Sequence, residues 1–254
     1  PLVCITTTAG TGSETDSGAV ISNDETHEKP GFVDDALFPV LSVVDPELML
    51  SVPPKFTAYQ GFDALFHSTE VYISSMANLM SDMYAITAIE NVSRNLAKCV
   101  KDGRDIEART KVAFGNTLSG SAMCVGACTS EHSLEHAMSA WHHELPHGAG
   151  LIMISLAFYQ HFIDKHVCDD RFVKMAQAMG MEDASKPQDF ITMLAKLQKE
   201  CGVDGLRMSD YGIRPEEFET LAKNAMDTMG FLFQCDRSQL SVADCVEIYR
   251  KSYR

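Results

Sequence analysis

The spacing of the apolar residues changes at residues 51–54, and this change restricts the folds that the chain can adopt. Before it, three short apolar runs are each followed by a turn signal, which is typical of buried strands. These runs are residues 2–5, 18–22 and 40–44. After it, apolar residues recur at helical spacing. We predict a mainly α fold, in which a β-rich segment of residues 1–52 precedes an all-helical domain of residues 53–254.

Eight helices are expected beyond residue 78, and several of them have recognisable first turns. Pro187 and Pro215 stand at first-turn positions and are followed by acidic residues, which favours a helix N-terminus there. Thr129 or Ser130 can cap the helix that begins beside them. The predicted helices are residues 79–100, 104–125, 129–143, 148–162, 169–179, 187–201, 215–229 and 241–253.

Composition excludes several classes of partner. Lys and Arg number 21 and Asp and Glu number 35, which gives a formal net charge of −14. Non-specific binding to nucleic acid or to anionic lipid requires a basic surface, so we expect neither partner. No apolar run reaches the roughly 18 residues of a membrane span. The eight cysteines lack C-x-x-C spacing and no signal peptide precedes them, which favours reduced thiols and a cytoplasmic protein.

Histidines and one aspartate are spaced in a way that favours a metal site. Asp63 and His67 are four positions apart, as are His132 and His136, so each pair would share one face of a helix. His147 follows between Pro146 and Gly148. A polar stripe or a buried core histidine explains any one of these residues better, but the set favours metal binding.

The chemistry of these side chains narrows the ion. One carboxylate with several imidazoles and no thiolate suits Zn²⁺ or Fe²⁺, whereas Ca²⁺ and Mg²⁺ would require more oxygen ligands. A position left open for substrate would make the site catalytic. His142 and His143 lie nearby and are interpreted as surface residues or as outer contacts of the site.

A glycine- and threonine-rich loop over residues 7–14 is the second candidate site. Its two glycines allow a close backbone approach, and its threonine hydroxyls and free N–H groups can bind phosphate or ribose oxygens. No Gly-Lys-Ser/Thr follows, so it is not a Walker loop. Thr15 stands where a third glycine would complete G-x-G-x-x-G, and a plain turn remains an alternative.

Taken together, these segments resemble the iron-containing (group III) alcohol dehydrogenases. Residues 7–14 resemble the T-T-x-G-T-G-S-E loop of that family. Residues 45–67 resemble its D-P-x-L…G-x-D-A-L-x-H segment, and residues 132–148 its H-x-x-x-H…P-H-G segment. The similarity extends to about residue 160, and beyond that point only the helical character agrees.

The resemblance implies a dehydroquinate synthase-like fold and assigns roles to individual residues. Residues 1–52 would be the C-terminal part of an α/β dinucleotide-binding domain, and residues 53–254 the helical metal-binding catalytic domain. One Fe²⁺ or Zn²⁺ ion would be bound by Asp63, His67, His132 and His147. His136 would lie beside the nicotinamide and take part in proton transfer. The residues that would contact NAD(P) are Thr7, Thr8, Gly10, Thr11 and Lys29.

The function implied by the resemblance is a metal-dependent, NAD(P)-linked alcohol dehydrogenase or aldehyde reductase. The metal would polarise the substrate oxygen during hydride transfer, with a small alcohol or aldehyde as partner and a homodimer or higher homo-oligomer as the assembly. The related glycerol dehydrogenases and dehydroquinate synthases lack a histidine at the position of His67. Alternatives are a polyol (glycerol-type) dehydrogenase or lyase on the same fold, a catalytically impaired metal-binding fragment and, more remotely, a structural protein.

Two departures from the family pattern affect these expectations. The spacer between His136 and His147 is slightly longer than usual, which would displace His147 unless a turn absorbs the extra length. Most of the N-terminal nucleotide-binding domain, with its G-G-G-S phosphate loop, has no counterpart in residues 1–50. If these 254 residues were the whole molecule, we would expect poor dinucleotide affinity.

Overall fold

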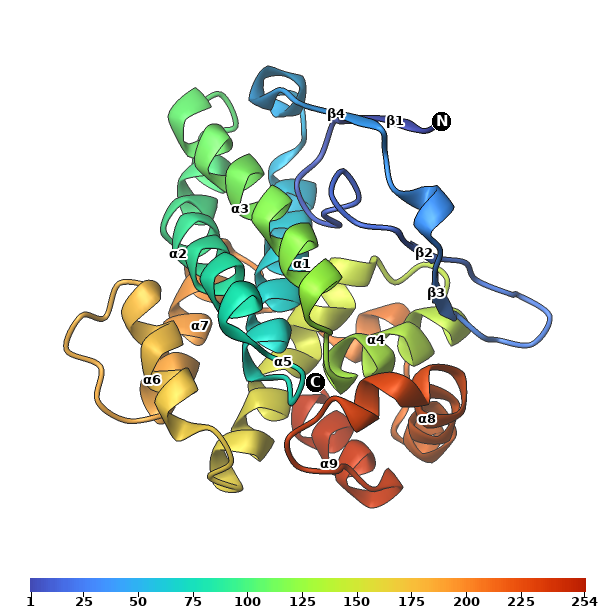
Figure 1. Ribbon diagram of the computed structural model, residues 1–254. Helices are drawn as coiled ribbons and strands as arrows, with labels where there is room; N and C mark the ends of the chain where they lie inside the picture. The colour runs from blue at the N-terminus through green and yellow to red at the C-terminus, as the bar shows by residue number, and fades with distance from the viewer.

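A computed structural model describes all residues from 1 to 254 and contains nine α-helices and two pairs of short strands (Figure 1). The mainly α fold is confirmed, because every element after residue 53 is helical. The helices are α1 (Pro54–Ile73), α2 (Leu79–Lys101), α3 (Ile106–Val125), α4 (Ser130–Trp141), α5 (His147–Asp164), α6 (Asp169–Ala178), α7 (Gln188–Glu200), α8 (Phe218–Gln234) and α9 (Val242–Ser252).

The strands all lie in the first 44 residues, on one side of the helical body (Figure 1). Strand β1 (Val3–Thr6) pairs in parallel with β4 (Leu41–Val44), and β2 (Gly18–Val20) pairs antiparallel with β3 (Gly31–Val33). The sequence prediction missed β3, whose three residues are all exposed and therefore show no buried pattern. The prediction of short strands before a helical body is otherwise confirmed.

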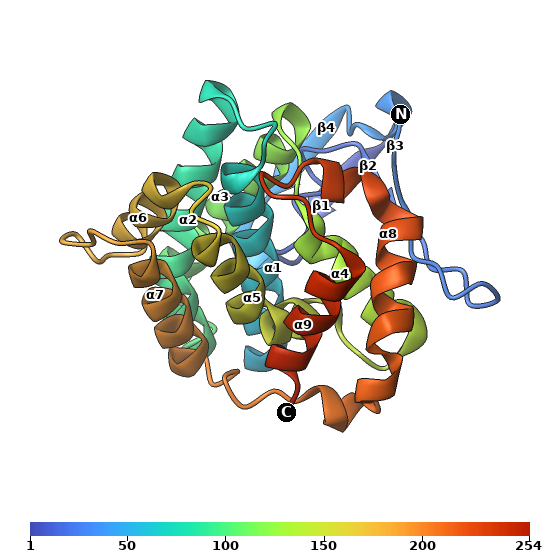
Figure 2. The same ribbon diagram turned by 90° about the horizontal axis from the view of Figure 1, so that it is seen from below.

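Helix α1 forms the centre of the helical body (Figures 1 and 2) and is surrounded by α2, α3, α5 and α6. Nearly every residue from Thr57 to Ile73 is buried, because the helix is apolar around most of its circumference. Polar side chains on such a helix must find partners inside the protein, since burying an unpaired charge is costly. Asp63, His67 and Glu70 are the acidic and histidine residues placed in this position.

Helix α5 packs directly against α1, and α4 packs on α5. Helix α4 is buried from Ser130 to Ala140 and packs against α5 and α8, while α5 packs against α1, α4 and α9. Aromatic rings fill the space between α1 and α5, and the ring centroids of Phe66 and Tyr159 are 6.2 Å apart. Each large apolar side chain buried here contributes roughly 1.5–3 kcal/mol.

The starts of two helices differ from the prediction for identifiable reasons. The Thr129 side chain does not cap α4, and Glu70 and Asp236 instead accept hydrogen bonds from the amides of Thr129 and Ser130. Residues Pro215–Glu217 form a separate 3₁₀ turn, after which α8 continues past its predicted end. A break in the backbone of α8 at Met229 (φ −132°, ψ 42°) marks the position where the prediction ended the helix.

The state of the cysteines and the apolar character of the helices concern the whole chain. All eight cysteines are free thiols, and most are buried, with Cys124 exposed and Cys4 half-buried. No helix has both the length and the apolar character needed to cross a membrane.

Candidate metal centre

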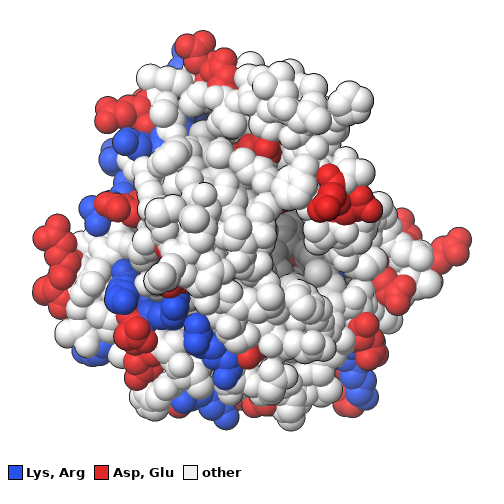
Figure 3. Space-filling view, viewed as in Figure 1, with Lys and Arg blue, Asp and Glu red and all other residues white.

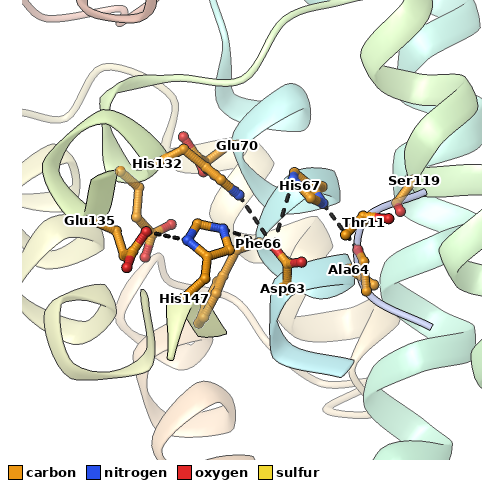
Figure 4. A network of polar contacts seen from close by, with 12 residues as sticks. Thr11, Asp63, Ala64, Phe66, His67, Glu70, Ser119, His132, Glu135 and His147 are labelled. Carbon is orange, nitrogen blue, oxygen red and sulfur yellow. Dashed lines mark hydrogen bonds and ion pairs between the residues drawn. The ribbon is translucent and has the colours of Figure 1, made fainter. Parts of the chain in front are cut away.

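The four residues expected to bind a metal come together at the centre of the helical body (Figure 4). Asp63 and His67 are one turn apart on α1, His132 lies on α4, and His147 is the first residue of α5. In Figure 4 the three imidazole rings point toward the Asp63 carboxylate. From Oδ1 of Asp63, the Nε2 atoms lie at 3.4 Å in His132, 3.4 Å in His147 and 3.6 Å in His67.

The three distances from Asp63 match the spacing between two donor atoms of a tetrahedral metal site. Ligand atoms bound to one ion at about 2.0–2.2 Å would lie about 3.3–3.6 Å from each other. The donor atoms of Asp63, His132 and His147 are all within 4.8 Å of one another. His67 contacts Asp63 but lies at the edge of this tighter group, with its ring stacked on that of His132 at 4.3 Å between centroids. Three nitrogens and one oxygen fit Zn²⁺ or Fe²⁺.

The histidines use their second ring nitrogen for outer contacts. Nδ1 of His67 lies 3.2 Å from the backbone carbonyl oxygen of Gly10. Nδ1 of His132 contacts the Glu70 carboxylate, and Nδ1 of His147 contacts the Glu135 carboxylate. Such contacts fix the orientation of a metal-binding ring. Sequence reasoning missed both glutamates, although each stands three positions after a histidine of the set on the same helix.

Charge interactions in the centre shift the pKa of each member. Burial alone would raise the pKa of Asp63, but His67 and His147 hold it well below its usual range. Burial lowers the pKa of His67 to about 3. The pKa of His132 is raised because Glu70 and Asp63 outweigh its burial, and that of His147 is raised because Glu135 and Asp63 do the same. The carboxylates around the centre therefore favour the charged form of His132 and His147 but not that of His67.

His136 lies beside the four residues without contacting Asp63. Its ring centroid is 5.2 Å from that of His147 and 6.2 Å from that of His132. Its Nδ1 is 2.9 Å from the sulfur of Met229, the residue at the break in α8. Burial and the neighbouring His147 hold the pKa of His136 well below its usual range, so its imidazole is neutral near pH 7.

The longer spacer before His147 is absorbed between two helices. Helix α4 ends at Trp141, and residues 142–146 form the connection to α5, which begins at His147. His147 therefore still reaches Asp63. His142 and His143 lie in this connection and face Glu217 and Asp24 at 3.5 and 3.8 Å, so they are not part of the centre.

The loop of residues 7–14 is fastened to helix α3. The amide of Gly12 (φ +67°) donates to Oδ1 of Asn116 at 3.1 Å, and Oε1 of Glu14 accepts a hydrogen bond from Nδ2 of Asn116 at 2.9 Å. Gly12 also packs so closely on Gly120 that neither has room for a Cβ atom. Thr7 and Thr11 are exposed and Thr8 is half-buried, so a ligand can reach their hydroxyls.

Lys29 lies close to the metal centre. Its Nζ atom donates to Oγ of Ser139 at 2.9 Å and lies 3.8 Å from Oε2 of Glu135, so the loop between β2 and β3 reaches α4.

Figure 3 shows a hollow beside α3 on this face of the molecule, with uncharged atoms along most of its rim.

Comparisons with known proteins cover the whole chain. A family model described as "Fe-containing alcohol dehydrogenase family, C-terminal" matches residues 57–253, and one described as "Iron-containing alcohol dehydrogenase" matches residues 1–46. The chain is 33% identical to the NAD-dependent methanol dehydrogenase of Bacillus methanolicus, with 98% of this chain and 64% of the relative aligned. It is 30% identical to Alcohol dehydrogenase 4 of Saccharomyces cerevisiae, with 100% of this chain and 65% of the relative aligned.

The fold agrees with that of a solved structure. The alcohol dehydrogenase ADH/D1 from an archaeal halo-thermophile of a Red Sea brine pool superposes with a TM-score of 0.94 at 31% identity, over 99% of this chain and 64% of that chain. The chain thus spans about 64% of the length of these relatives.

Proposed function

The chain belongs to the iron-containing alcohol dehydrogenase family, and from this premise we propose that it supplies the metal-binding catalytic domain of an NAD(P)-linked alcohol dehydrogenase or aldehyde reductase. The observation that carries the proposal is that three imidazoles from α1, α4 and α5 lie within 3.4–3.6 Å of the Asp63 carboxylate, with the donor atoms of His132 and His147 grouped tightly around it. Residues 53–254 would form this domain, and residues 1–52 would contribute to the dinucleotide-binding part.

Asp63, His67, His132 and His147 would hold the ion, Fe²⁺ or Zn²⁺. A divalent ion bound there would act as a Lewis acid toward the oxygen of an alcohol or aldehyde. The helices shield most of the centre from water, since Asp63, His67 and His132 are buried, while the His147 side chain stays 28% exposed. In a site shielded in this way, electrostatic effects on the substrate are stronger than in water.

His136 would exchange a proton with the substrate oxygen. Its Nδ1 faces the weakly accepting sulfur of Met229, so a proton on Nδ1 leaves Nε2 with a free lone pair. The lowered pKa of His136 keeps the ring neutral, which a group that accepts a proton from an alcohol requires.

The proposed cofactor is NAD(P), bound by the residues that the resemblance indicates. Thr7 and Thr11 are exposed and Thr8 is half-buried on the loop that is anchored on α3, while the buried Gly10 brings this loop close to Asp63. Lys29 would contact the cofactor from the other side, next to Ser139. The name of the Bacillus methanolicus relative, an NAD-dependent methanol dehydrogenase, supports this choice of cofactor.

We also propose a small primary alcohol or the matching aldehyde as substrate, by analogy with the names of the relatives. The working assembly would be a homodimer or larger homo-oligomer. The eight free thiols favour a reducing compartment, so the protein would act in the cytoplasm.

Replacement of His67 by alanine tests the proposal. We expect metal content and alcohol-dependent NAD(P) reduction to fall together, because His67 would supply one of four ligands. Metal analysis of protein purified without oxygen, with turnover measured on the same samples, checks this result. Unchanged metal content would remove His67 from the ligand set.

Calorimetric titration with NADH distinguishes a dehydrogenase from the main alternative, a metal-binding chain that is catalytically impaired. Binding of the dinucleotide by the metal-loaded chain supports a dehydrogenase. Metal binding without any dinucleotide binding would instead favour a metal-binding chain that is catalytically impaired. Turnover of glycerol with none of simple primary alcohols would favour a polyol dehydrogenase.

A further inference from the structure

Two buried glutamates contact two histidines of the metal centre. Glu70 lies on α1 and Glu135 on α4, and both have 0% exposed surface. Figure 4 shows Glu70 beside His132, and Glu135 on the side of His147 that faces away from Asp63. Neither carboxylate contacts Asp63, so they do not take part in the central group of donor atoms.

The two histidines have the same arrangement of contacts. In His132 and in His147, Nε2 lies 3.4 Å from Oδ1 of Asp63, and Nδ1 contacts a glutamate. A histidine that binds a metal through Nε2 carries its proton on Nδ1. A carboxylate that accepts this proton in a hydrogen bond fixes the tautomer and the ring orientation, and makes Nε2 a more basic ligand.

The Glu70 carboxylate is itself fixed in position. One oxygen contacts His132, while the other accepts hydrogen bonds from the backbone amide of Thr129 at 2.9 Å and from its hydroxyl at 2.8 Å. Thr129 directly precedes α4, the helix that carries His132. Glu70 therefore ties α1 to the start of α4 and holds the ring of His132 through the same carboxylate.

The Glu135 carboxylate has its own counter-charge. Its Oε2 atom contacts His147 and lies 3.8 Å from the Lys29 ammonium, whereas its Oε1 atom has no hydrogen-bond partner. Three carboxyl groups therefore lie in or beside the centre, those of Asp63, Glu70 and Glu135, and Lys29 is the basic side chain next to them.

A purely structural role is the competing explanation, and Glu131 shows what such a role looks like. Glu131 lies on α4, is also 0% exposed, and accepts a hydrogen bond from the Tyr159 hydroxyl at 2.5 Å without contacting a histidine. Glu70 and Glu135 each contact Nδ1 of a histidine instead, so they differ from Glu131 in their partner and not in their burial.

We propose that Glu70 and Glu135 are positioning residues of the metal centre, which orient the Nε2 lone pairs of His132 and His147 toward the ion. The proposal rests on the proposed function only in requiring that the site binds a divalent cation. His67 differs from His132 and His147, because its Nδ1 lies beside the backbone carbonyl oxygen of Gly10 and not beside a glutamate.

Zinc affinity of the variants Glu70→Gln and Glu135→Gln tests this role, with Glu131→Gln as the matched control. Competition with a chromophoric chelator gives the affinity of the metal-free chain for Zn²⁺. We expect about 10- to 100-fold weaker binding in the first two variants, as is typical when such an outer partner is lost. The control should bind as tightly as the wild type. With Co²⁺ in place of zinc, the absorption bands should shift in the first two variants alone.

Melting temperatures of the metal-free variants separate positioning from structural support. A structural role would lower these temperatures and leave the zinc affinity of the folded protein unchanged, which would overturn the proposal. If a glutamine variant fails to fold, Glu70→Asp or Glu135→Asp provides the same comparison, because it keeps the charge and withdraws the carboxylate by one methylene. A wild-type chain that binds no zinc would contradict the proposed function itself, and the positioning role would fall with it.

Discussion

At the start of α4, a carboxylate from a distant part of the chain takes the place of a helix cap. Oδ1 of Asp236 accepts a hydrogen bond from the amide of Ser130 at 3.1 Å, while its Oδ2 is buried without a partner. Burial raises the pKa of this carboxyl from 3.8 to about 8. The negative form is therefore disfavoured in the folded protein, although it lies at a helix N-terminus.

The raised pKa of Asp236 predicts how stability depends on pH. The folded protein holds the proton up to about pH 8, whereas the unfolded chain loses it near pH 4, so ionisation destabilises the fold as pH rises between these values. Asp236→Asn keeps the hydrogen-bond acceptor and cannot ionise. We expect its stability relative to wild type to increase over this range, by a few kcal/mol at most.

Urea unfolding of the metal-free proteins between pH 5 and pH 8.5 measures this effect. Asp183→Asn, which changes an exposed carboxylate, is the control and should follow the wild type. Parallel pH curves for Asp236→Asn and wild type would contradict the prediction.

The sequence could identify the histidines of the centre but not their carboxylate partners. Asp63 and His67 repeat at helical spacing, as do His132 and His136, and imidazoles in such a pattern have few common roles. Glu70 and Glu135 carry no comparable signal, because a glutamate on a helix is usually exposed. Only the three-dimensional packing of α1, α4 and α5 shows that both are buried beside a ring.

At the scale of the elements, the sequence predicted helix bounds well where one face of the helix is apolar. It failed where contacts with other elements determine whether a segment is a helix or a strand. The amphipathic pattern of α2 placed it within one residue of its observed end at Lys101. The continuation of α8 beyond Met229 was missed because the backbone break there interrupts the pattern. Strand β3 was missed because pairing with β2, rather than burial, makes it a strand.

The start of α5 depends on a glycine. A Cβ atom on Gly148 would collide with the backbone of Tyr59 on α1, so the two helices can be this close only without a side chain there. Gly148→Ala should move α5 away from α1 and carry His147 with it. We expect a loss of stability of about 1–3 kcal/mol, as in other overpacked cores, together with weaker zinc binding.

Gly205→Ala is the matched control, because a Cβ atom at Gly205 meets no other atom within 4 Å and its backbone needs no positive φ. Chemical denaturation and zinc titration of both variants make the comparison. Equal stability of the two variants would show that α1 and α5 adjust to the added methyl group.

For the whole molecule, the metal would act as a bond between three helices that are distant in sequence. Zn²⁺ at about 100 times its dissociation constant should stabilise the fold by about 2.7 kcal/mol. For a chain of this size, that corresponds to a rise of about 5–10 °C in melting temperature. A chelator should reverse the rise.

Thermal unfolding with Mg²⁺ provides the control, since this ion prefers oxygen ligands and the centre offers mainly nitrogen. A melting temperature that does not respond to zinc, or that responds equally to both ions, would contradict a specific site.

On the strand side of the molecule, unlike in the helical body, apolar side chains are exposed. The side chains of Val3, Ile5, Leu41 and Val43 on β1 and β4 are 39–57% exposed, although their parallel pairing is typical of sheets that are covered on both faces. The apolar spacing of residues 1–50 correctly indicated strands, but it could not show that the helical body leaves them uncovered.

The hydrogen-bond distance between the Gly10 carbonyl and Nδ1 of His67 makes the threonine loop a direct neighbour of the metal centre. A dinucleotide that shifts the backbone of this loop would also shift a ring that faces the ion. Binding of the dinucleotide and binding of the metal ion would then be thermodynamically linked. Reciprocity requires that each ligand changes the affinity of the chain for the other by the same factor. In such an arrangement, binding at the loop would change the metal affinity of the centre without any movement between domains.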